Sequence, residues 1–326
     1  MNEQKINKSA IVTRLVIWSV VSLLLISVFI AAMIDSGSSG WKIGGIMFKT
    51  IPYVSEKVWG YENWIVSTHK VGQSKCADDN KILPKIIGEN YPLLIKLIQA
   101  NETLSVQVHP EDEYAAKVEN TYGKTECWYI LDAKPDATLV CGLKKDYTRE
   151  ELSSAIENNT LDECLKYVPV EKGDFVFIPA GTVHAIQGGL RILEIQQPSD
   201  ITYRLYDWGR PREIHIEKGL DVTKAFAPEP EKPFSKDFSC NYFSLVQQDI
   251  SSSGETVSLV PENKSSPAYK TGYVSLFVLS GSGKLFSKTE NKEIDVKPED
   301  TLLVKADEEI FAGLDANSKE LSLMKI

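Results

Sequence analysis

The sequence has no surplus of positive charge. It contains 36 lysines and arginines against 45 aspartates and glutamates, which gives a formal net charge of −9 at pH 7. Nucleic-acid binding depends on a cationic surface that neutralises phosphates, so this balance argues against a nucleic-acid partner. The contents of 43% hydrophobic and 25% charged residues are those of an ordinary globular protein, and they exclude a disordered chain and a polytopic membrane protein.

Cysteine and histidine are also scarce. The five cysteines are Cys76, Cys127, Cys141, Cys164 and Cys240. They are odd in number, widely spaced and never in a Cys-x-x-Cys pattern, which excludes a disulfide scaffold and a zinc ribbon. The four histidines are His69, His109, His184 and His215. A metal site in this chain must therefore use few imidazoles and add oxygen ligands.

One long hydrophobic run lies near the N-terminus. Residues 15–34 carry no charged side chain, and a helix of this length rises about 30 Å, which is enough to cross the hydrocarbon core of a bilayer. Basic residues precede the run and Asp35 follows it, so the positive-inside rule places the N-terminus in the cytoplasm and the rest of the chain outside. We expect residues 1–46 to be an uncleaved segment with a transmembrane-like helix and a linker, because a signal peptide would have a shorter apolar run.

Beyond Met47 the sequence consists of short apolar runs separated by Gly, Pro, Asp and Asn. Such runs predict the strands of a β-sandwich or β-barrel. The predicted strands are 93–98, 104–108, 127–131, 137–141, 175–178, 191–195, 202–206, 242–246, 274–279, 302–304 and 321–324. Few helices are expected, and the clearest begins after Thr148, where Glu151 completes a capping box.

The length of the chain and one unusual stretch predict two domains. A single core rarely serves 326 residues. The stretch 228–237 is rich in proline and charge, as expected of a domain boundary. We therefore place one domain at 47–232 and a second at 233–326.

The two halves share a loose hydrophobic repeat. The aligned segments are 126–131 with 274–279 and 173–185 with 299–311. Apolar positions coincide in these alignments, which indicates two copies of one structural unit. Polar positions do not coincide, because Glu126 aligns with Val274 and His184 aligns with Ile310. A site in the first half would therefore be missing from the second.

Polar residues with ligand chemistry fall on three strand-like segments. Gln107 and His109 alternate with valines, so the period of two places both on one strand face. Glu126 begins an apolar run, and His184 follows a Pro-x-Gly turn that points it inward. These four residues offer two nitrogens and two oxygens, a set that suits zinc with positions left open for substrate.

Four segments together resemble a known family. SVQVHPEDEYA, GKTECWYI, FIPAGTVHAI and ITYRLYDWGR are similar to the short bacterial form of type I mannose-6-phosphate isomerase, also called phosphomannose isomerase, a zinc-dependent cupin. The resemblance runs from about Met47 to the C-terminus. It implies an all-β fold of two cupin-type β-barrel or jelly-roll domains with a few short helices. The first domain, 47–232, would hold the metal, and the second, 233–326, would be degenerate and lack metal ligands.

The resemblance also implies roles for individual residues. The implied ligands of one Zn²⁺ per chain are Gln107, His109, Glu126 and His184. Arg204 is implied as an active-site residue, and Lys124 as a catalytic residue close to the reacting carbons. Lys96 and Ser105 would bind substrate nearer the phosphate. We expect His215 to be an ordinary strand residue.

The implied reaction is the reversible isomerisation of mannose 6-phosphate and fructose 6-phosphate through a zinc-stabilised enediol. Its partner is a small-molecule sugar phosphate, which favours a catalytic body in the cytoplasm and conflicts with the orientation that the positive-inside rule gives. Residues 15–34 predict a possible membrane association. A second possibility is a non-catalytic, membrane-anchored sugar-binding cupin, which would not need Lys124 and Arg204. A third is another metal-dependent cupin enzyme using iron or manganese, but such sites usually draw on three histidines and only two are in place here.

Overall fold

The computed structural model describes residues 45–225, 227–258 and 271–326. Residues Ile46–Ile326 form one compact unit. The transmembrane-like helix that the sequence predicts at 15–34 lies outside the described residues. Within the described ranges, no helix combines the length and the hydropathy needed to cross a membrane.

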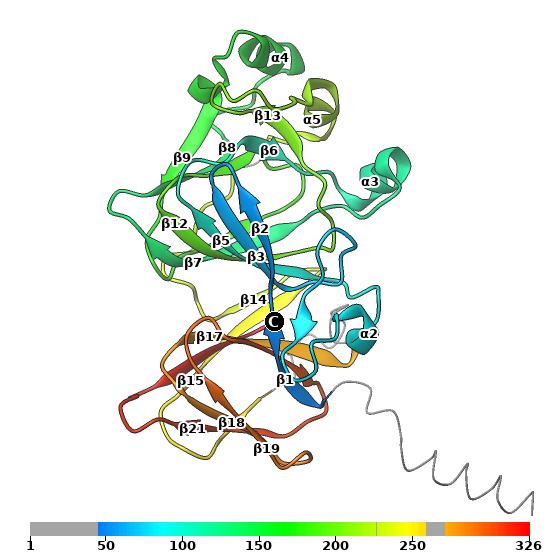
Figure 1. Cartoon of the computed structure of the whole chain (residues 1–326). Helices are drawn as coiled ribbons and strands as arrows, with labels where there is room; N and C mark the ends of the chain where they lie inside the picture. The colour runs from blue at the N-terminus through cyan, green and yellow to red at the C-terminus, as the bar shows by residue number, and fades with distance from the viewer. Residues whose placement is uncertain (1–44, 226, 259–270) are drawn as a thin grey trace, which may run out of the picture. The chain divides into compact units, whose positions relative to one another are not determined.

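The described residues form mainly β-strands with a few short helices, as predicted (Figure 1). The strands are β1 (Met47–Ile51), β2 (Tyr53–Lys57), β3 (Gly60–Val66), β4 (Lys75–Cys76), β5 (Leu94–Ala100), β6 (Val106–Val108), β7 (Glu126–Ala133), β8 (Thr138–Leu143), β9 (Leu165–Pro169), β10 (Phe175–Ile178), β11 (His184–Ile186), β12 (Leu190–Gln196), β13 (Tyr203–Tyr206), β14 (Asp237–Ser239), β15 (Ser244–Ile250), β16 (Glu255–Val257), β17 (Tyr273–Ser280), β18 (Gly283–Ser287), β19 (Lys292–Val296), β20 (Thr301–Lys305), β21 (Ile310–Leu314) and β22 (Leu321–Lys325). The helices are α2 (Pro84–Ile87), α3 (Asp112–Glu119), α4 (Arg149–Glu157), α5 (Ile216–Val222) and the 3₁₀ helix η1 (Leu161–Cys164). Helix α4 begins with the predicted capping box, because Thr148 and Glu151 each bond the backbone N–H of the other.

The strands form four sheets. Their orders are β10-β7-β12-β5-β3-β2, β13-β6-β11-β8-β9, β14-β15-β22-β17-β20-β1-β4 and β16-β21-β18-β19. We call the first two sheets the first sandwich and the last two the second sandwich. Among the described residues no sheet closes on itself, so of the two predicted forms, β-barrel or sandwich, the closed β-barrel is wrong. Side chains that interdigitate between two open sheets hold each sandwich together, rather than a continuous ring of backbone hydrogen bonds.

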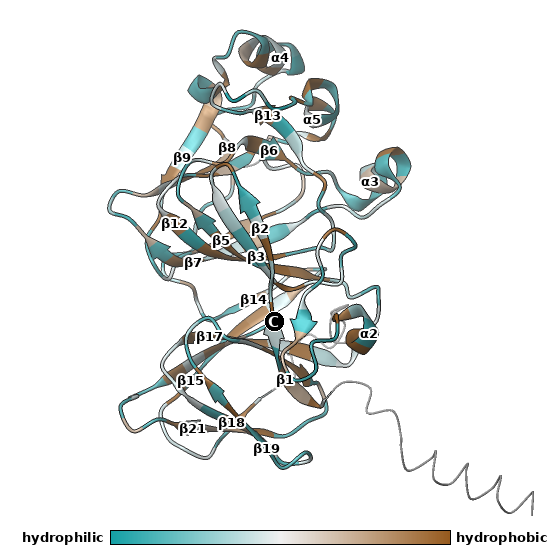
Figure 2. Cartoon of the chain, in the orientation of Figure 1, coloured by the Kyte–Doolittle hydropathy of each residue, from teal (hydrophilic) through white to brown (hydrophobic). Residues whose placement is uncertain are grey.

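The four sheets are arranged as layers (Figure 1). Side chains that alternate between the two faces of each strand form the cores between these layers. Inside the first sandwich, Trp128 and Ile192 of the six-stranded sheet pack in one core with Leu139 of the five-stranded sheet. Residues one position away face the opposite side, where Leu193 shares a core with Phe277 of the seven-stranded sheet. Figure 2 shows hydrophobic segments on the strands that border this central layer. Both faces of the six- and seven-stranded sheets are thus covered, which explains their nearly continuous apolar sequences.

The outer face of the five-stranded sheet is covered by helices. Val106 and Ala185 on this face share a core with Leu152 of α4 and Leu220 of α5. Because successive residues of a strand point to opposite faces, Gln107 and His184 point instead into the first sandwich. The helices thus fix which side chains of β6 and β11 face inward.

The strand pairing confirms the predicted internal repeat. In the first sandwich, Ile178 of β10 lies opposite Glu126 of β7. In the second, Val304 of β20 lies opposite Val274 of β17. These are the pairs that the sequence alignment places in equivalent positions. Val274 and Ile310, which replace Glu126 and His184, are buried apolar residues.

Strand β1 belongs to the seven-stranded sheet of the second sandwich. Its residue Met47 lies opposite Val304 of β20, although 47 was placed in the first half of the chain by the sequence. The stretch 228–237 also makes specific contacts, since Glu231 and Phe175 exchange two backbone hydrogen bonds. The chain therefore passes between the two sandwiches after β1 and again along the stretch 228–237.

Candidate active site

A row of polar residues crosses the inner face of the six-stranded sheet. Lys96 on β5 lies opposite Glu194 on β12, and Glu194 lies opposite Trp128 on β7. Lys96 Nζ is 3.0 Å from Glu194 Oε1, and Trp128 Nε1 donates to Glu194 Oε2 at 3.0 Å. Burial opposes ionisation of Glu194, but the Lys96 ammonium outweighs it and lowers the pKa of this carboxyl. Lys96 and Glu194 are therefore a buried ion pair.

The facing five-stranded sheet brings three predicted residues together. Gln107 on β6 lies opposite His184 on β11 and opposite Arg204 on β13. Directly opposed residues share one face of a sheet, with Cβ atoms about 5 Å apart. The amide, the imidazole and the guanidinium therefore project from neighbouring strands into the first sandwich.

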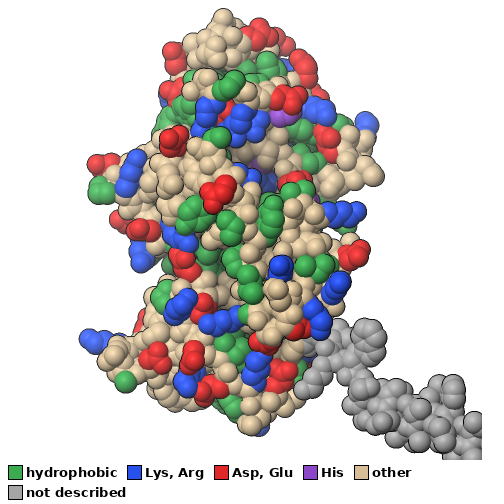
Figure 3. Space-filling view, in the orientation of Figure 1, with side chains coloured by type: hydrophobic (Ala, Val, Ile, Leu, Met, Phe, Trp, Pro, Cys, Tyr) green, Lys and Arg blue, Asp and Glu red, His purple; other side chains and the backbone are tan. Residues whose placement is uncertain are grey.

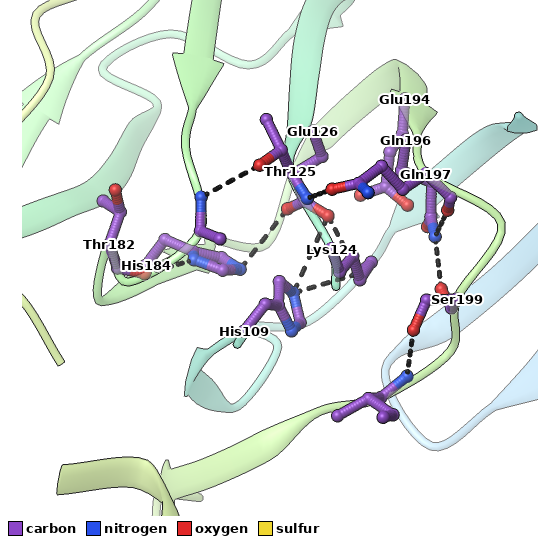
Figure 4. A network of polar contacts seen from close by, with 12 residues as sticks. His109, Lys124, Thr125, Glu126, Thr182, His184, Glu194, Gln196, Gln197 and Ser199 are labelled. Carbon is purple, nitrogen blue, oxygen red and sulfur yellow. Dashed lines mark hydrogen bonds and ion pairs between the residues drawn. The ribbon is translucent and has the colours of Figure 1, made fainter. Parts of the chain in front are cut away.

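His109, Glu126 and His184 form a buried cluster between the two sheets (Figure 4). Glu126 Oε1 is 3.4 Å from His184 Nε2, and Glu126 Oε2 is 3.7 Å from His109 Nε2. One potential ligand atom of each residue lies within 4.8 Å of the others. In the part of the chain that the structure describes, no other group of His, Cys, Asp and Glu has this metal-compatible geometry.

The turn before β11 orients His184 and ties it to His109. His184 Nδ1 lies 2.8 Å from the carbonyl oxygen of Thr182, which leaves Nε2 directed at the cluster. The N–H of Gly181 donates to the carbonyl of His109 at 2.8 Å. Gly181 has a φ of +93°, a left-handed conformation that a residue with a Cβ adopts only under strain. The Pro-x-Gly pattern is therefore needed to close this turn.

The donor atoms of the cluster fit a divalent metal ion. Oε1 of Glu126 and Nε2 of His184 are buried and have no hydrogen-bond partner among the described residues, whereas Oε2 of Glu126 is paired with the Lys124 ammonium. Burial lowers the pKa of His184 to about 4, and burial together with Lys124 lowers the pKa of His109 well below its usual value. Both imidazoles are thus neutral at pH 7, the form that binds metals. Unpaired buried donors of this kind are expected where a metal ligand set is built.

Lys124 connects this cluster to a neighbouring cavity. Its Nζ is 2.8 Å from Glu126 Oε2 and 2.9 Å from His109 Nε2. The cavity, of about 280 Å³, also contains four further predicted residues, Lys96, Ser105, Gln107 and Arg204. Figure 3 shows Lys and Arg side chains gathered around and inside a hollow in the upper half of the view. The sequence-predicted residues therefore meet at one place.

Arg204 is held at the cavity wall by its neighbours. Its backbone N–H donates to His215 Nδ1 at 3.2 Å, and its Nη1 donates to the carbonyl of Glu213 at 2.8 Å. Its Nε is buried and has no hydrogen-bond partner among the residues described. Burial and the adjacent guanidinium of Arg212 lower the pKa of Arg204. The guanidinium therefore retains a free donor for an anionic ligand.

The prediction that His215 is a strand residue is wrong. His215 is the residue that precedes helix α5. Gly219 allows this helix to approach β13 closely. A Cβ at Gly219 would lie 2.4 Å from a methyl group of Leu205. The helix therefore places the His215 imidazole next to β13, where it accepts a hydrogen bond from the backbone N–H of Arg204.

A larger cavity of about 500 Å³ contains none of the predicted site residues. It is lined by His69, Tyr122, Gln197 and Tyr242, among others. His69 Nε2 is 3.7 Å from Asp200 Oδ1, and Asp200 lines the smaller cavity. Size alone would therefore select the wrong cavity, whereas ligand chemistry selects the one next to the cluster.

Sequence reasoning missed several polar residues of the site. Glu194 is the most important, because it neutralises Lys96. Lys96 and Glu194 each place one charge within an apolar strand sequence, and the two charges have opposite signs. This pattern could have predicted that the two residues form a buried pair. Asp200 and Arg212 also line the cavity, but they lie in loop sequence, where no periodicity predicts the direction of a side chain.

The fold and the site define a mainly-β, cupin-type protein with a candidate metal centre. The structure of mannose 6-phosphate isomerase from Bacillus subtilis matches with a TM-score of 0.72 and 26% identity, over 86% of this chain and 100% of that one. Residues 37–140 match the family model described as phosphomannose isomerase type I, catalytic domain.

Two sequence relatives agree with this match. "Probable mannose-6-phosphate isomerase GmuF" of Bacillus subtilis is 38% identical over 257 residues, which cover 69% of this chain and 78% of that protein. Mannose-6-phosphate isomerase ManA of the same organism is 33% identical over 283 residues, or 72% of this chain and 86% of that protein. The chain belongs to the type I phosphomannose isomerase family, an enzyme family, as the sequence motifs predicted.

Proposed function

We propose that this chain interconverts mannose 6-phosphate and fructose 6-phosphate. The observation that carries the proposal is that Lys124 contacts a buried His-Glu-His cluster and, together with Arg204, lines the adjacent cavity. Membership in the type I phosphomannose isomerase family supports it, since the named relatives are mannose-6-phosphate isomerases.

A zinc ion is the metal we propose for the cluster. It would be held by His109, Glu126 and His184, with Gln107 as a fourth ligand. The position of Gln107 directly opposite His184 supports its proposed role as a ligand. Nitrogen and oxygen donors in this number suit zinc with open positions. When bound, zinc would supply Lewis-acid polarisation of the sugar carbonyl.

Lys124 and Arg204 are the residues we propose to act on the sugar. Isomerisation moves a proton between C1 and C2, so a group that can accept and return a proton must lie next to both carbons. Lys124 is placed for this role because its Nζ touches the cluster and also faces the cavity. Arg204 does not exchange protons, and its fixed charge would stabilise the enediolate form of the substrate.

The remaining cavity wall would bind the anionic end of the substrate. Five cations and three carboxylates line it, so the cavity is positive within an acidic protein. Lys96 and Ser105 are the proposed substrate-binding residues. The charge of Lys96 is already neutralised by Glu194, so we expect Lys96 to hold a sugar oxygen or position Glu194, with Arg204 providing the uncompensated charge.

We further propose two domains along the chain, a catalytic one at 47–232 and one without metal ligands at 233–326, with β1 and β4 of the first completing a sheet of the second. The supporting observation is the repeated strand register, with Val274 in place of Glu126. We also propose that the catalytic body works in the cytoplasm, where sugar phosphates are produced. Fractionation of native cells, with activity measured in each fraction, would test that location and any association through residues 15–34.

A coupled assay of the full chain tests the proposed function. We expect isomerase activity that is lost on complete metal removal by a chelator and restored by zinc. His184→Ala should fail to retain metal, whereas Arg204→Ala should retain it and lose most of its kcat. Full activity without metal would refute the zinc mechanism. Absence of activity in the zinc-loaded wild type would refute the isomerase assignment itself.

A further inference from the structure

A cluster of hydrogen bonds clamps the segment that carries Lys124. The N–H of Gly123 donates to Asp112 Oδ1 at 2.8 Å, and the N–H of Thr125 donates to Gln197 Oε1 at 2.8 Å. Gln197 Nε2 in turn donates to the same Asp112 oxygen at 2.9 Å. The side chains of Asp112 and Gln197 therefore bond the backbone on both sides of Lys124, as Figure 4 shows for Gln197 and Thr125. We call these two residues, together with Tyr242 described below, the clamp.

Backbone contacts also hold this segment, since the N–H of Lys124 donates to the carbonyl of Pro110 at 3.0 Å and the carbonyl of Thr125 accepts from the N–H of Gln197 at 3.2 Å. Residues 122–125 form no regular secondary structure, so their backbone N–H groups lack the partners that a sheet would supply. Glu126, the first residue of β7, follows directly. Asp112 lies three positions after His109 in the sequence. The clamp thus joins the backbone near one member of the metal cluster to the backbone that carries another.

The third member of the clamp comes from the other sandwich. Tyr242, in the turn between β14 and β15, donates its hydroxyl to Asp112 Oδ2 at 3.0 Å. Burial and the adjacent Asp112 carboxylate raise the pKa of Tyr242 to about 12, so its hydroxyl is a donor at neutral pH. Asp112 thus accepts three hydrogen bonds, from Gly123, Gln197 and Tyr242.

We propose that Asp112, Gln197 and Tyr242 are positioning residues that set the distance between Lys124, Glu126 and His109. The inference rests on the proposed function, in which these groups act at the metal centre. It assigns a role to the second sandwich, which lacks a metal cluster of its own among the residues described. Outer partners of metal ligands typically affect metal affinity or activity by about 10–100-fold.

Two variants and a matched control test the proposal on the full chain. Asp112→Asn weakens the three hydrogen bonds that Asp112 accepts, and Tyr242→Phe removes only the bond from the second sandwich. The control is Tyr114→Phe, which removes a Tyr hydroxyl that donates to Asp221 Oδ2 at 3.0 Å on the exposed side of α3. Zinc affinity is measured by chelator competition, kcat and KM by the coupled assay, and folding by thermal unfolding.

We expect Asp112→Asn to lower zinc affinity and kcat by about 10-fold or more, with KM changing less than kcat. Tyr242→Phe should produce a smaller change in the same direction, and Tyr114→Phe should change neither quantity. Zinc affinity and kcat within twofold of wild type in both clamp variants would overturn the proposal, whatever their thermal stability. Because zinc affinity is measured without substrate, the clamp can fail or succeed independently of the isomerase assignment.

Discussion

Removal of the Lys96 ammonium should destabilise the protein strongly. Lys96 Nζ and Glu194 Oε1 are 3.0 Å apart, and both side chains are about 95% buried. At this distance, two unit charges attract each other by about 5 kcal/mol when the effective dielectric constant is about 20. The substitution Lys96→Met keeps the aliphatic volume but leaves Glu194 charged, buried and bonded only to Trp128. We therefore expect a loss of about 3–5 kcal/mol in the free energy of unfolding.

Urea unfolding of three further variants checks the cause of this loss. Lys96→Met combined with Glu194→Gln removes both charges and should recover most of the stability, since replacing a whole buried pair costs little. Lys218→Met is the matched control, because Lys218 forms a more exposed pair with Glu119 at 2.7 Å and should cost less than about 1 kcal/mol. Glu194→Gln alone completes the thermodynamic cycle. A loss below about 1 kcal/mol for Lys96→Met, or no recovery in the double variant, would refute the buried ion pair.

Three other predictions follow from the same structure. Glu194→Gln should make the free energy of unfolding fall less steeply as pH is lowered. The pKa of Glu194 is lowered in the fold, so the stability it contributes is present above the ordinary carboxyl pKa of about 4.3 and is lost as pH falls below that value. Equal slopes below this pH in wild type and variant would contradict the prediction. Thr148→Ala should cost about 1 kcal/mol by removing the α4 cap, and urea unfolding that shows no change would contradict it. Phe277→Ala should cost about 3–5 kcal/mol, because Phe277 lies in the core shared by both sandwiches, and two separate unfolding transitions would contradict that sharing.

Periodicity made much of this architecture predictable. The strand at 175–178 was predicted with the bounds that β10 has, and the alignment of Glu126 with Val274 agrees with the observed register. These features depend on local patterns of apolar residues, which a sequence shows directly. The meeting of His109 and His184 was predictable for the same reason, since strand alternation fixes which face each side chain takes.

Features that depend on partners distant in sequence were not predictable. No local pattern shows whether the edge strands of a sheet join, so the sequence left β-barrels and open sandwiches as alternatives, and the structure has open sandwiches. The helix at Ile216–Val222 was missed because it depends on the close approach of Gly219 to Leu205, a contact that the local sequence does not show. Tyr242 gave no signal either, since its partner Asp112 lies 130 residues away. In each case the deciding interaction is tertiary.

The pairing of β1 with β20 has a consequence for synthesis on the ribosome. Lys49 on β1 forms an ion pair with Asp300, 251 residues later in the chain. At about 5–20 residues per second, translation takes roughly 10–50 s to span that interval. Throughout this time β4 can pair with one edge of β1, but the edge that pairs with β20, which includes the buried residues Met47 and Phe48, has no partner. We expect the hydrogen bonds between β1 and β20 to be among the last to form.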